Sequence, residues 1–280
     1  MEYLPILVIF ALTALGIFLY LWVPAFRLRR ALARPFPRAH ELVLRRHLPA
    51  WRSLPPQLKL QLQRLIKQFL FEKTFVGCDG LTVTDEMRVT IAAKAGMLLL
   101  NRQAPLYPKL DTVLVYPSAF VAPRNEVGIG GIVTHASHQL AGESWSDGRV
   151  ILAWDHVLRG GIDGGHDVAL HEFAHQLDSE SGSVNGAPLM PASRYARWSA
   201  VMSMEFERLQ LAATYGAPSV LDYYGATNPA EFFAVATEAF HGRPHELAEA
   251  HPALFEELRG YYRVDPRAWV APLPMPVPVF

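Results

Sequence analysis

Residues 164–178 read GGHDVALHEFAHQLD, a glycine-containing loop followed by an apolar segment that carries two histidines and an acid. Asp167 is suited to the cap position of a helix, because a carboxylate there accepts hydrogen bonds from the free N–H groups of the first turn. The residues after it are mainly Val, Ala, Leu and Phe. They predict a helix buried in the core of a globular domain.

His171 and His175 are four residues apart, so both imidazoles lie on one face of this helix and can point at one metal ion. Glu172 lies on the adjacent side, where its carboxylate can reach a metal-bound water. The alternative is a core helix in which two histidines and an acid are buried without a function, and such burial is costly. The pattern therefore predicts a site for metal-assisted hydrolysis.

A catalytic zinc site usually has three protein ligands and one open position, so one more ligand is expected downstream. Residues 224–234 read YGATNPAEFFA. Thr227 or Asn228 can cap a helix here, with Pro229 at its first position. Glu231 would then project from the first turn and is the strongest candidate for the third ligand. Weaker candidates are Glu205, Glu207 and Asp222.

Two further acids could support the ligands. Glu238 lies two turns beyond Glu231 on the same helix face, where it is suited to a hydrogen bond to a ligand histidine. An ordinary salt bridge is the alternative for Glu238. Asp178 follows His175 by about one turn, and it either orients a ligand or bonds only to the backbone.

The N-terminal segment is a candidate membrane anchor. Residues 4–23 contain no charged residue and are about as long as a helix that crosses the hydrocarbon core of a bilayer. A cleaved signal peptide is the alternative, which the absence of a basic start disfavours. By the positive-inside rule, we expect a single-pass membrane protein with its downstream domain in the cytoplasm. The arginines that follow the run are Arg27, Arg29, Arg30, Arg34, Arg38, Arg45 and Arg46.

The composition limits the remaining possibilities. The chain has 280 residues, of which 51% are hydrophobic, and this is enough for a sizeable core. Lys and Arg total 26 and balance 26 Asp and Glu, so direct nucleic-acid binding is not expected. The single cysteine excludes an intramolecular disulfide and a zinc site built from several cysteines.

Apolar spacing predicts helices over 55–71 and 84–100, and short β-branched runs predict strands over 113–116 and 150–154. If the second strand is a sheet edge beside the catalytic helix, an extended peptide could bind it by strand addition. Alternating prolines after Asp265 predict an extended tail that is a free end or docks on a partner or on the domain's own cleft. The expected segments are a transmembrane anchor over 1–26, a basic juxtamembrane linker over 27–54, a catalytic domain over 55–265 and a Pro-rich tail over 266–280.

Several phrases of the sequence resemble one known family. They are GLTVTDE at 80–86, VYP at 115–117, GESW at 142–145, HEFAHQLD at 171–178 and YGATNPAEFF at 224–233. Through them the chain, over roughly residues 55–262, resembles the MtfA (Mlc titration factor A-like) family. These are bacterial zinc-dependent peptidases whose catalytic domain is similar to that of anthrax lethal factor. The resemblance implies an α+β, zincin-like domain of the gluzincin type, with a mainly helical scaffold and a small sheet.

The resemblance also implies roles for single residues. Zinc would be held by His171, His175 and Glu231, with Glu172 as the general base and Tyr224 as a hydroxyl donor to the developing oxyanion. The expected activity is hydrolysis of peptide bonds by a metal-bound water, with aminopeptidase-like specificity. The alternative is a regulatory protein that sequesters a transcriptional repressor, as members of the family are associated with doing, with secondary or latent peptidase activity. Because the family is bacterial, the resemblance implies that the membrane crossed by the apolar start is the bacterial inner membrane. The family's cytoplasmic members lack this apolar start.

Overall fold

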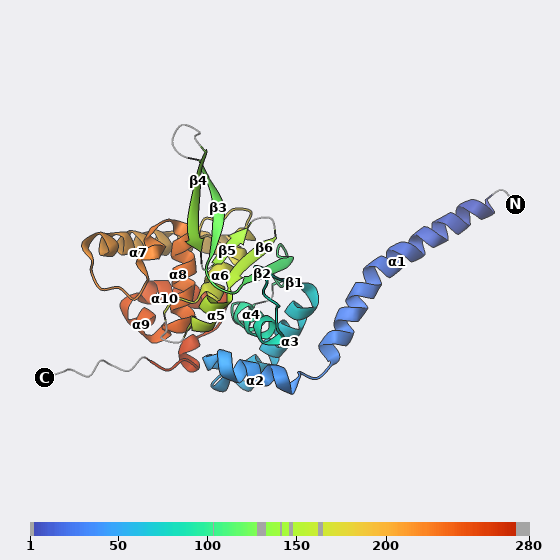
Figure 1. Ribbon diagram of the computed structural model, residues 1–280, viewed down its shortest axis with the longest axis horizontal. Coiled ribbons are helices and arrows are strands. Elements are labelled where there is room, and N and C mark those ends of the chain that lie inside the picture. The colour runs from blue at the N-terminus through green and yellow to red at the C-terminus, as the bar shows by residue number, and fades with distance from the viewer. Residues whose placement is uncertain are drawn as a thin grey trace.

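The structure, a computed structural model, describes residues 3–102, 104–127, 133–140, 142–145, 148–161 and 165–272. Helices surround a small four-stranded sheet, and one long helix projects from this body at the N-terminal end (Figure 1). The expected combination of a mainly helical scaffold, a small sheet and one apolar N-terminal helix is therefore confirmed.

The two predicted helices before the sheet are present. Helix α3 spans Pro56–Glu72 and helix α4 spans Asp85–Met97, and they pack against each other. Thr84 caps α4, because its hydroxyl oxygen accepts a hydrogen bond from the N–H of Met87. Phe69 of α3 also packs against Phe75, with 5.9 Å between the ring centroids.

The main sheet has the strand order β1-β2-β6-β5. Strands β1 (Thr74–Gly77), β2 (Thr112–Tyr116) and β6 (Arg149–Ala153) run parallel, and β5 (Gly142–Trp145) pairs antiparallel with β6. The two predicted strands are confirmed as β2 and β6. The suggestion that β6 is a sheet edge is wrong, because β2 and β5 occupy its two sides. A peptide therefore cannot add to β6, and β5 is the edge strand on that side.

The chain between β2 and β5 forms a separate antiparallel pair, made of β3 (Phe120–Val127) and β4 (Val133–Leu140). This pair stands out from the body of the domain (Figure 1). After β6 the chain enters α5 (Trp154–Arg159), so Trp154, expected as the last residue of a strand, begins a helix instead.

The C-terminal half of the described chain is helical. Helix α6 (Val168–Ser179) lies between the sheet and the later helices (Figure 1). Its Phe173 anchors it in the core, with its ring centroid 5.7 Å from that of Phe69 and 5.1 Å from that of Tyr107. The following elements are η2 (Ala192–Arg194), α7 (Tyr195–Tyr215), η3 (Tyr223–Ala226), α8 (Pro229–Gly242), α9 (Pro244–Ala250), α10 (Pro252–Tyr262) and η4 (Pro266–Ala268).

The segment over 27–54, expected as a linker, is instead mostly helical and largely part of the domain. It contains α2 (Arg38–His47) and the short η1 (Pro49–Arg52). Leu44 and Trp51 are only 1% and 3% exposed, and burial of such side chains stabilises the packed arrangement. The arginines of α2 that suggested a linker stay on its solvent side.

Helix α1 (Leu4–Ala33) contains the apolar run and continues past it into the arginine-rich residues. Within Val8–Ala33 the most apolar 18-residue window has a mean hydropathy of 2.2, and none of that window is buried against the rest of the chain. Among the described residues it is the one helix long and apolar enough to cross a membrane. Lys67 Nζ donates to the carbonyl oxygens of Leu32 at 2.5 Å and Arg34 at 2.7 Å, which ties the end of α1 to the domain.

The expected tail over 266–280 begins later than predicted. Pro266 lies in η4, and Trp269 is 7% exposed, because its indole packs on the core. His245 Nε2 lies 2.9 Å from the carbonyl oxygen of Val270 and holds the next residue. Residues 273–280, which hold most of the alternating prolines, lie outside the described part of the chain.

Candidate metal centre

The helix that carries the two histidines begins as its sequence predicts. Asp167 Oδ1 accepts hydrogen bonds from the backbone N–H groups of Ala169 and Leu170, both at 3.2 Å, and so caps α6. His171 and His175 are 4% and 9% exposed. Helix α6 therefore holds both imidazoles almost fully buried.

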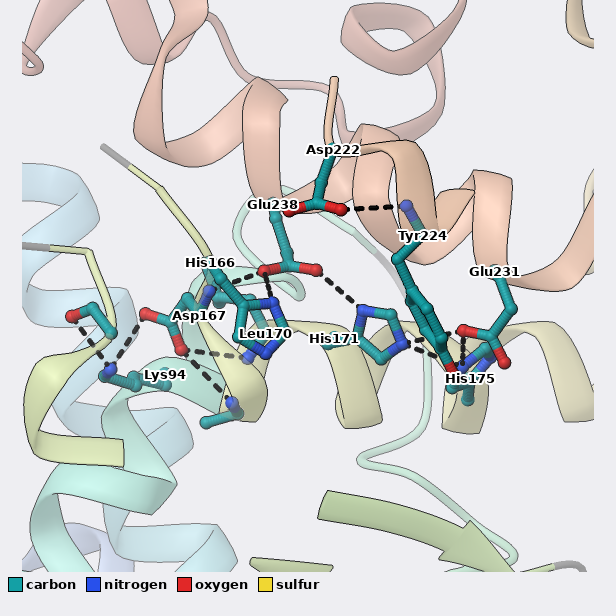
Figure 2. A network of polar contacts seen from close by, with 12 residues as sticks. Lys94, His166, Asp167, Leu170, His171, His175, Asp222, Tyr224, Glu231 and Glu238 are labelled. Carbon is teal, nitrogen blue, oxygen red and sulfur yellow. Dashed lines mark hydrogen bonds and ion pairs between the residues drawn. The ribbon is translucent and has the colours of Figure 1, made fainter. Parts of the chain in front are cut away.

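The first turn of α8 brings an acid to the same place. Asn228, one of the two expected caps, accepts from the N–H groups of Ala230 at 2.9 Å and Glu231 at 3.0 Å. Pro229 occupies the first helical position, where its missing N–H costs nothing. This cap fixes Glu231 beside His175, at the end of the polar network in Figure 2.

Three possible ligand atoms converge at this point. His171 Nε2 lies 2.9 Å from Glu231 Oε2, His175 Nε2 lies 3.3 Å from the same oxygen, and the two nitrogens are 3.2 Å apart. A tetrahedral ion with bonds of about 2.0 to 2.1 Å holds its ligand atoms roughly 3.3 Å apart. The three side chains therefore fit one metal ion, and two imidazoles with one carboxylate are a ligand set that suits zinc.

The pKa shifts of His171 and Glu231 agree with this arrangement. Burial alone would lower the pKa of His171, but its hydrogen bonds to Glu231 and Glu238 outweigh burial and raise it well above 6.5. Burial would likewise raise the pKa of Glu231, but His171 and His175 outweigh burial and lower it strongly. A carboxylate that stays ionised against its own desolvation can face a cation, and a metal ion competes with protons for these atoms.

Glu172 lies next to this cluster and is 5% exposed. Burial raises the pKa of its carboxyl group, although His171 and His175 oppose the shift. A carboxyl group with a raised pKa is a better proton acceptor when ionised, which suits a group that takes and returns a proton. Gly142 on β5 packs against Glu172, since a Cβ atom at Gly142 would lie 2.7 Å from Glu172 Oε1.

Glu238 joins the back of the site to α8. Its Oε1 lies 2.6 Å from His171 Nδ1, on the opposite side of the ring from Glu231. Its Oε2 accepts from the N–H of Asp167 at 2.5 Å and lies 2.8 Å from His166 Nδ1. With Nδ1 of His171 engaged in this way, Nε2 is left to face Glu231 (Figure 2).

Sequence reasoning missed two members of this network. His166 stands directly before the helix cap, and its pKa is raised by its hydrogen bond to Glu238. Lys94 on α4 is 3% exposed and lies 2.8 Å from Asp167 Oδ2. A lysine within the otherwise apolar run of α4 was a signal of a buried partner, but the sequence could not say which acid supplies it.

Tyr224 lies at the open side of the cluster. It is 51% exposed, and its ring centroid is 5.9 Å from that of His171. Its side chain extends toward His175 and Glu231 (Figure 2). Asp222 caps this turn by accepting from the N–H of Tyr224 at 2.8 Å, so the structure gives Asp222 a structural task.

The other weaker candidates lie apart from the cluster. Glu205 Oε2 lies 2.7 Å from His251 Nδ1 in a separate buried pair, and Glu207 is exposed on α7. Asp178 Oδ2 accepts from the N–H of Gly186 at 2.6 Å. Asp178 Oδ1 and His175 Nδ1 have no hydrogen-bond partner among the described residues, and the hydrogen bond that Asp178 accepts comes from the backbone. Burial raises the pKa of Asp178.

Comparisons with known proteins agree with a metallopeptidase site. A model of the glucose-regulated metallo-peptidase family M90 matches residues 23–263, which include the whole cluster. The Synechocystis protein slr2042 is 41% identical over 90% of this chain and 94% of its own length. Mlc titration factor A of Serratia proteamaculans is 31% identical over 83% of this chain and 91% of its own length. The Klebsiella pneumoniae protein of that name is 29% identical over 78% and 84%.

Proposed function

The chain belongs to the glucose-regulated metallo-peptidase M90 family, and we propose that it is a zinc-dependent peptidase of the gluzincin type. Membership implies a metallopeptidase that uses a metal ion. The observation that carries the finer proposal is the approach of His171 Nε2, His175 Nε2 and Glu231 Oε2 to within 3.3 Å of one another. These three atoms would hold the ion, and Glu172 follows His171 on the same helix.

Each residue has one task in the proposed reaction. Zinc, when bound, would act as a Lewis acid that polarises the scissile carbonyl and lowers the pKa of a bound water. Glu172 takes the proton of the attacking water and returns it to the leaving amine. Tyr224 donates a hydrogen bond where negative charge develops on the carbonyl oxygen, an interaction worth roughly 3 kcal/mol per donor. Glu238 holds the His171 ring through Nδ1.

The central experiment separates metal binding from chemistry. We expect the full chain, purified in detergent, to hold about one zinc ion and to cleave peptides in a chelator-sensitive way. Glu172→Gln should keep the zinc and lose hydrolysis, whereas His171→Ala or Glu231→Ala should lose the metal. Peptide cleavage that survives in Glu172→Gln would overturn the mechanism, and a chain without zinc would overturn the site.

The specificity we propose is aminopeptidase-like. We expect the protein to hydrolyse amino-acid p-nitroanilides. It should not hydrolyse the same substrates after their amino groups are acetylated. Equal cleavage of blocked and free peptides would make the protein an endopeptidase and leave the zinc site itself unaffected.

We also propose that α1 holds the protein in a bacterial inner membrane with the domain facing the cytoplasm. The support is the apolar character of Val8–Ala33 and the arginines that follow residue 26. The chain should stay in the membrane pellet after alkaline extraction. A green fluorescent protein fused to the C-terminus should fluoresce. Alkaline phosphatase fused at the same place should be inactive, because that enzyme is active only in the periplasm. The opposite pair of results would reverse the orientation.

A second candidate function is the sequestration of a transcriptional repressor, because several relatives carry the name Mlc titration factor A. One feature favours a protein partner: Met204, Leu211 and Tyr215 lie along one face of α7 and are 54%, 60% and 81% exposed. Zinc binding without chelator-sensitive turnover, together with capture of a purified glucose-responsive repressor, would favour this function. Turnover without capture would favour the peptidase alone.

A further inference from the structure

A line of buried polar contacts leads from the metal centre back to α4 (Figure 2). It begins at Lys94, whose Nζ donates to Asp167 Oδ2 at 2.8 Å and to the carbonyl oxygens of Val157 at 2.8 Å and Gly160 at 3.3 Å. Lys94 is 3% exposed and Asp167 is 5% exposed. All three donors of the ammonium group are thus engaged, away from solvent.

Asp167 contacts both helices that carry the metal centre, α6 and α8. Its Oδ1 caps α6, the helix of His171, and its own N–H donates to Glu238 Oε2 at 2.5 Å. Glu238 in turn contacts His171 Nδ1 at 2.6 Å. Four residues therefore connect α4 to the metal-facing imidazole through contacts of 2.8 Å or less.

The packing around the first pair leaves no room for adjustment. A Cβ atom at Gly160 would come within 2.8 Å of both Lys94 Nζ and Asp167 Cγ. The backbone at Gly160, with φ of −58° and ψ of 131°, is open to any residue, so space and not conformation requires glycine here.

We propose that Lys94 and Asp167 are positioning residues of the metal centre, which act through Glu238 to fix the orientation and tautomer of His171. The inference rests on the proposed zinc site and deepens it. Neither residue touches the ion or the substrate.

The physical reason is the cost of an unpaired buried charge. Without Lys94, the carboxylate of Asp167 would stay buried beside the carbonyl oxygens of Val157 and Gly160, so Asp167 would have to shift toward water. Its N–H would then leave Glu238 Oε2, whose remaining contact is with His166, a residue with a side chain that is 47% exposed. Glu238 would no longer be held, and neither would the ring of His171.

Measurement of zinc affinity tests this series of contacts independently of peptidase activity. Lys94→Met in the full chain, in detergent, should raise the zinc dissociation constant about tenfold, the lower end of the range for partners of ligands. The absorption spectrum of the cobalt(II)-substituted protein should also change. The matched control is Glu205→Gln, which breaks another buried pair, that of Glu205 with His251. It should lower the melting temperature and leave zinc affinity and the cobalt spectrum unchanged.

Two further variants separate positioning from general damage. Lys94→Met combined with Asp167→Asn removes both charges and keeps an oxygen for the helix cap, so zinc affinity should return to within about threefold of the wild type. Gly160→Ala keeps both charges and displaces them, and it should weaken zinc binding as Lys94→Met does.

The outcomes are distinguishable. If the wild type binds zinc and Lys94→Met binds it equally well with an unchanged cobalt spectrum, the inference is wrong while the zinc site stands. If Lys94→Met and Glu205→Gln weaken zinc binding equally, the effect is general instability, and the inference is wrong as well. If the wild type binds no zinc, the proposed function itself fails.

Discussion

Gly142 on β5 lies directly against Glu172 on α6, because a Cβ atom at Gly142 would come within 2.7 Å of both Cγ and Oε1 of the glutamate. The same atom would lie 2.6 Å from Cγ2 of Val168. The edge strand can therefore meet this helix only without a side chain at position 142. One wall of the space around the proposed base is thus made of strand backbone.

Gly142→Ala should displace the Glu172 carboxylate and leave the three metal-facing atoms in place. A displacement of about 1 Å from productive geometry can lower turnover about 100-fold, so we expect a loss of that order in kcat with zinc content unchanged. Gly165→Ala is the matched control, because a Cβ there has no heavy atom within 4 Å. Equal turnover of the Gly142 variant and the wild type would contradict the contact's role.

Tyr224→Phe removes the hydroxyl group proposed to bond the developing oxyanion. Loss of one such donor typically lowers kcat by about 100-fold or more, with little change in KM or zinc content. Tyr223→Phe provides a neighbouring control, because the Tyr223 hydroxyl donates to the carbonyl oxygen of Ala217 away from the cluster. A rise in KM with unchanged kcat would instead assign Tyr224 to substrate binding.

Asp178→Ala tests the two roles that sequence reasoning left open. Because the carboxylate accepts from the N–H of Gly186 in a fully buried position, we expect the free energy of unfolding to fall by roughly 2 to 3 kcal/mol. The zinc dissociation constant should change less than threefold. Glu238→Gln should show the reverse pattern, with zinc binding weakened about 10-fold to 100-fold. A tenfold loss of zinc affinity in Asp178→Ala would favour the ligand-orienting role.

His241 makes a prediction about acid stability. Burial among aromatic rings lowers its pKa to about 3, so folded His241 is neutral at a pH where the unfolded chain, with a pKa near 6.5, is protonated. Between pH 6.5 and 3 the unfolded state therefore binds the additional proton, and this residue destabilises the fold progressively as the pH falls.

His241→Leu should remove that dependence. Relative to the wild type, its free energy of unfolding should gain up to about 1.4 kcal/mol for each pH unit below 6, and the difference should be constant above pH 7.5. Urea unfolding with a chelator present measures this without a contribution from metal release. Parallel stability curves from pH 4 to 8 would show that His241 does not titrate in this way.

Local chemistry made much of the site predictable. The caps Asp167 and Asn228, with Pro229 after the second, act over a few residues, so both helices that carry the cluster could be predicted from the sequence. Spacing along one turn then placed His171 and His175 on one face. The direction of Glu238 also followed from helix periodicity, and the structure places its carboxylate at His171 Nδ1.

Contacts between distant segments were not predictable. Lys94 and Asp167 are 73 residues apart, and no local pattern links them. The central place of β6 depends on the order in which strands pair, which a run of β-branched residues does not encode. The burial of Leu44 and Trp51 was hidden because arginines and prolines surround these apolar residues in the sequence. Composition there suggested a linker, but packing against the core decided the structure.

The hydrogen bonds from Lys67 to Leu32 and Arg34 have a consequence for how the proposed peptidase would find its substrates. A domain on a flexible tether sweeps a wide volume, whereas here the folded residues resume at Arg38, only a few residues after α1 ends. With α1 in the bilayer, the proposed metal centre would stay close to the lipid. Location would then select substrates alongside sequence, since peptide chains at the membrane face that carries the domain are within reach and freely diffusing ones must first arrive there.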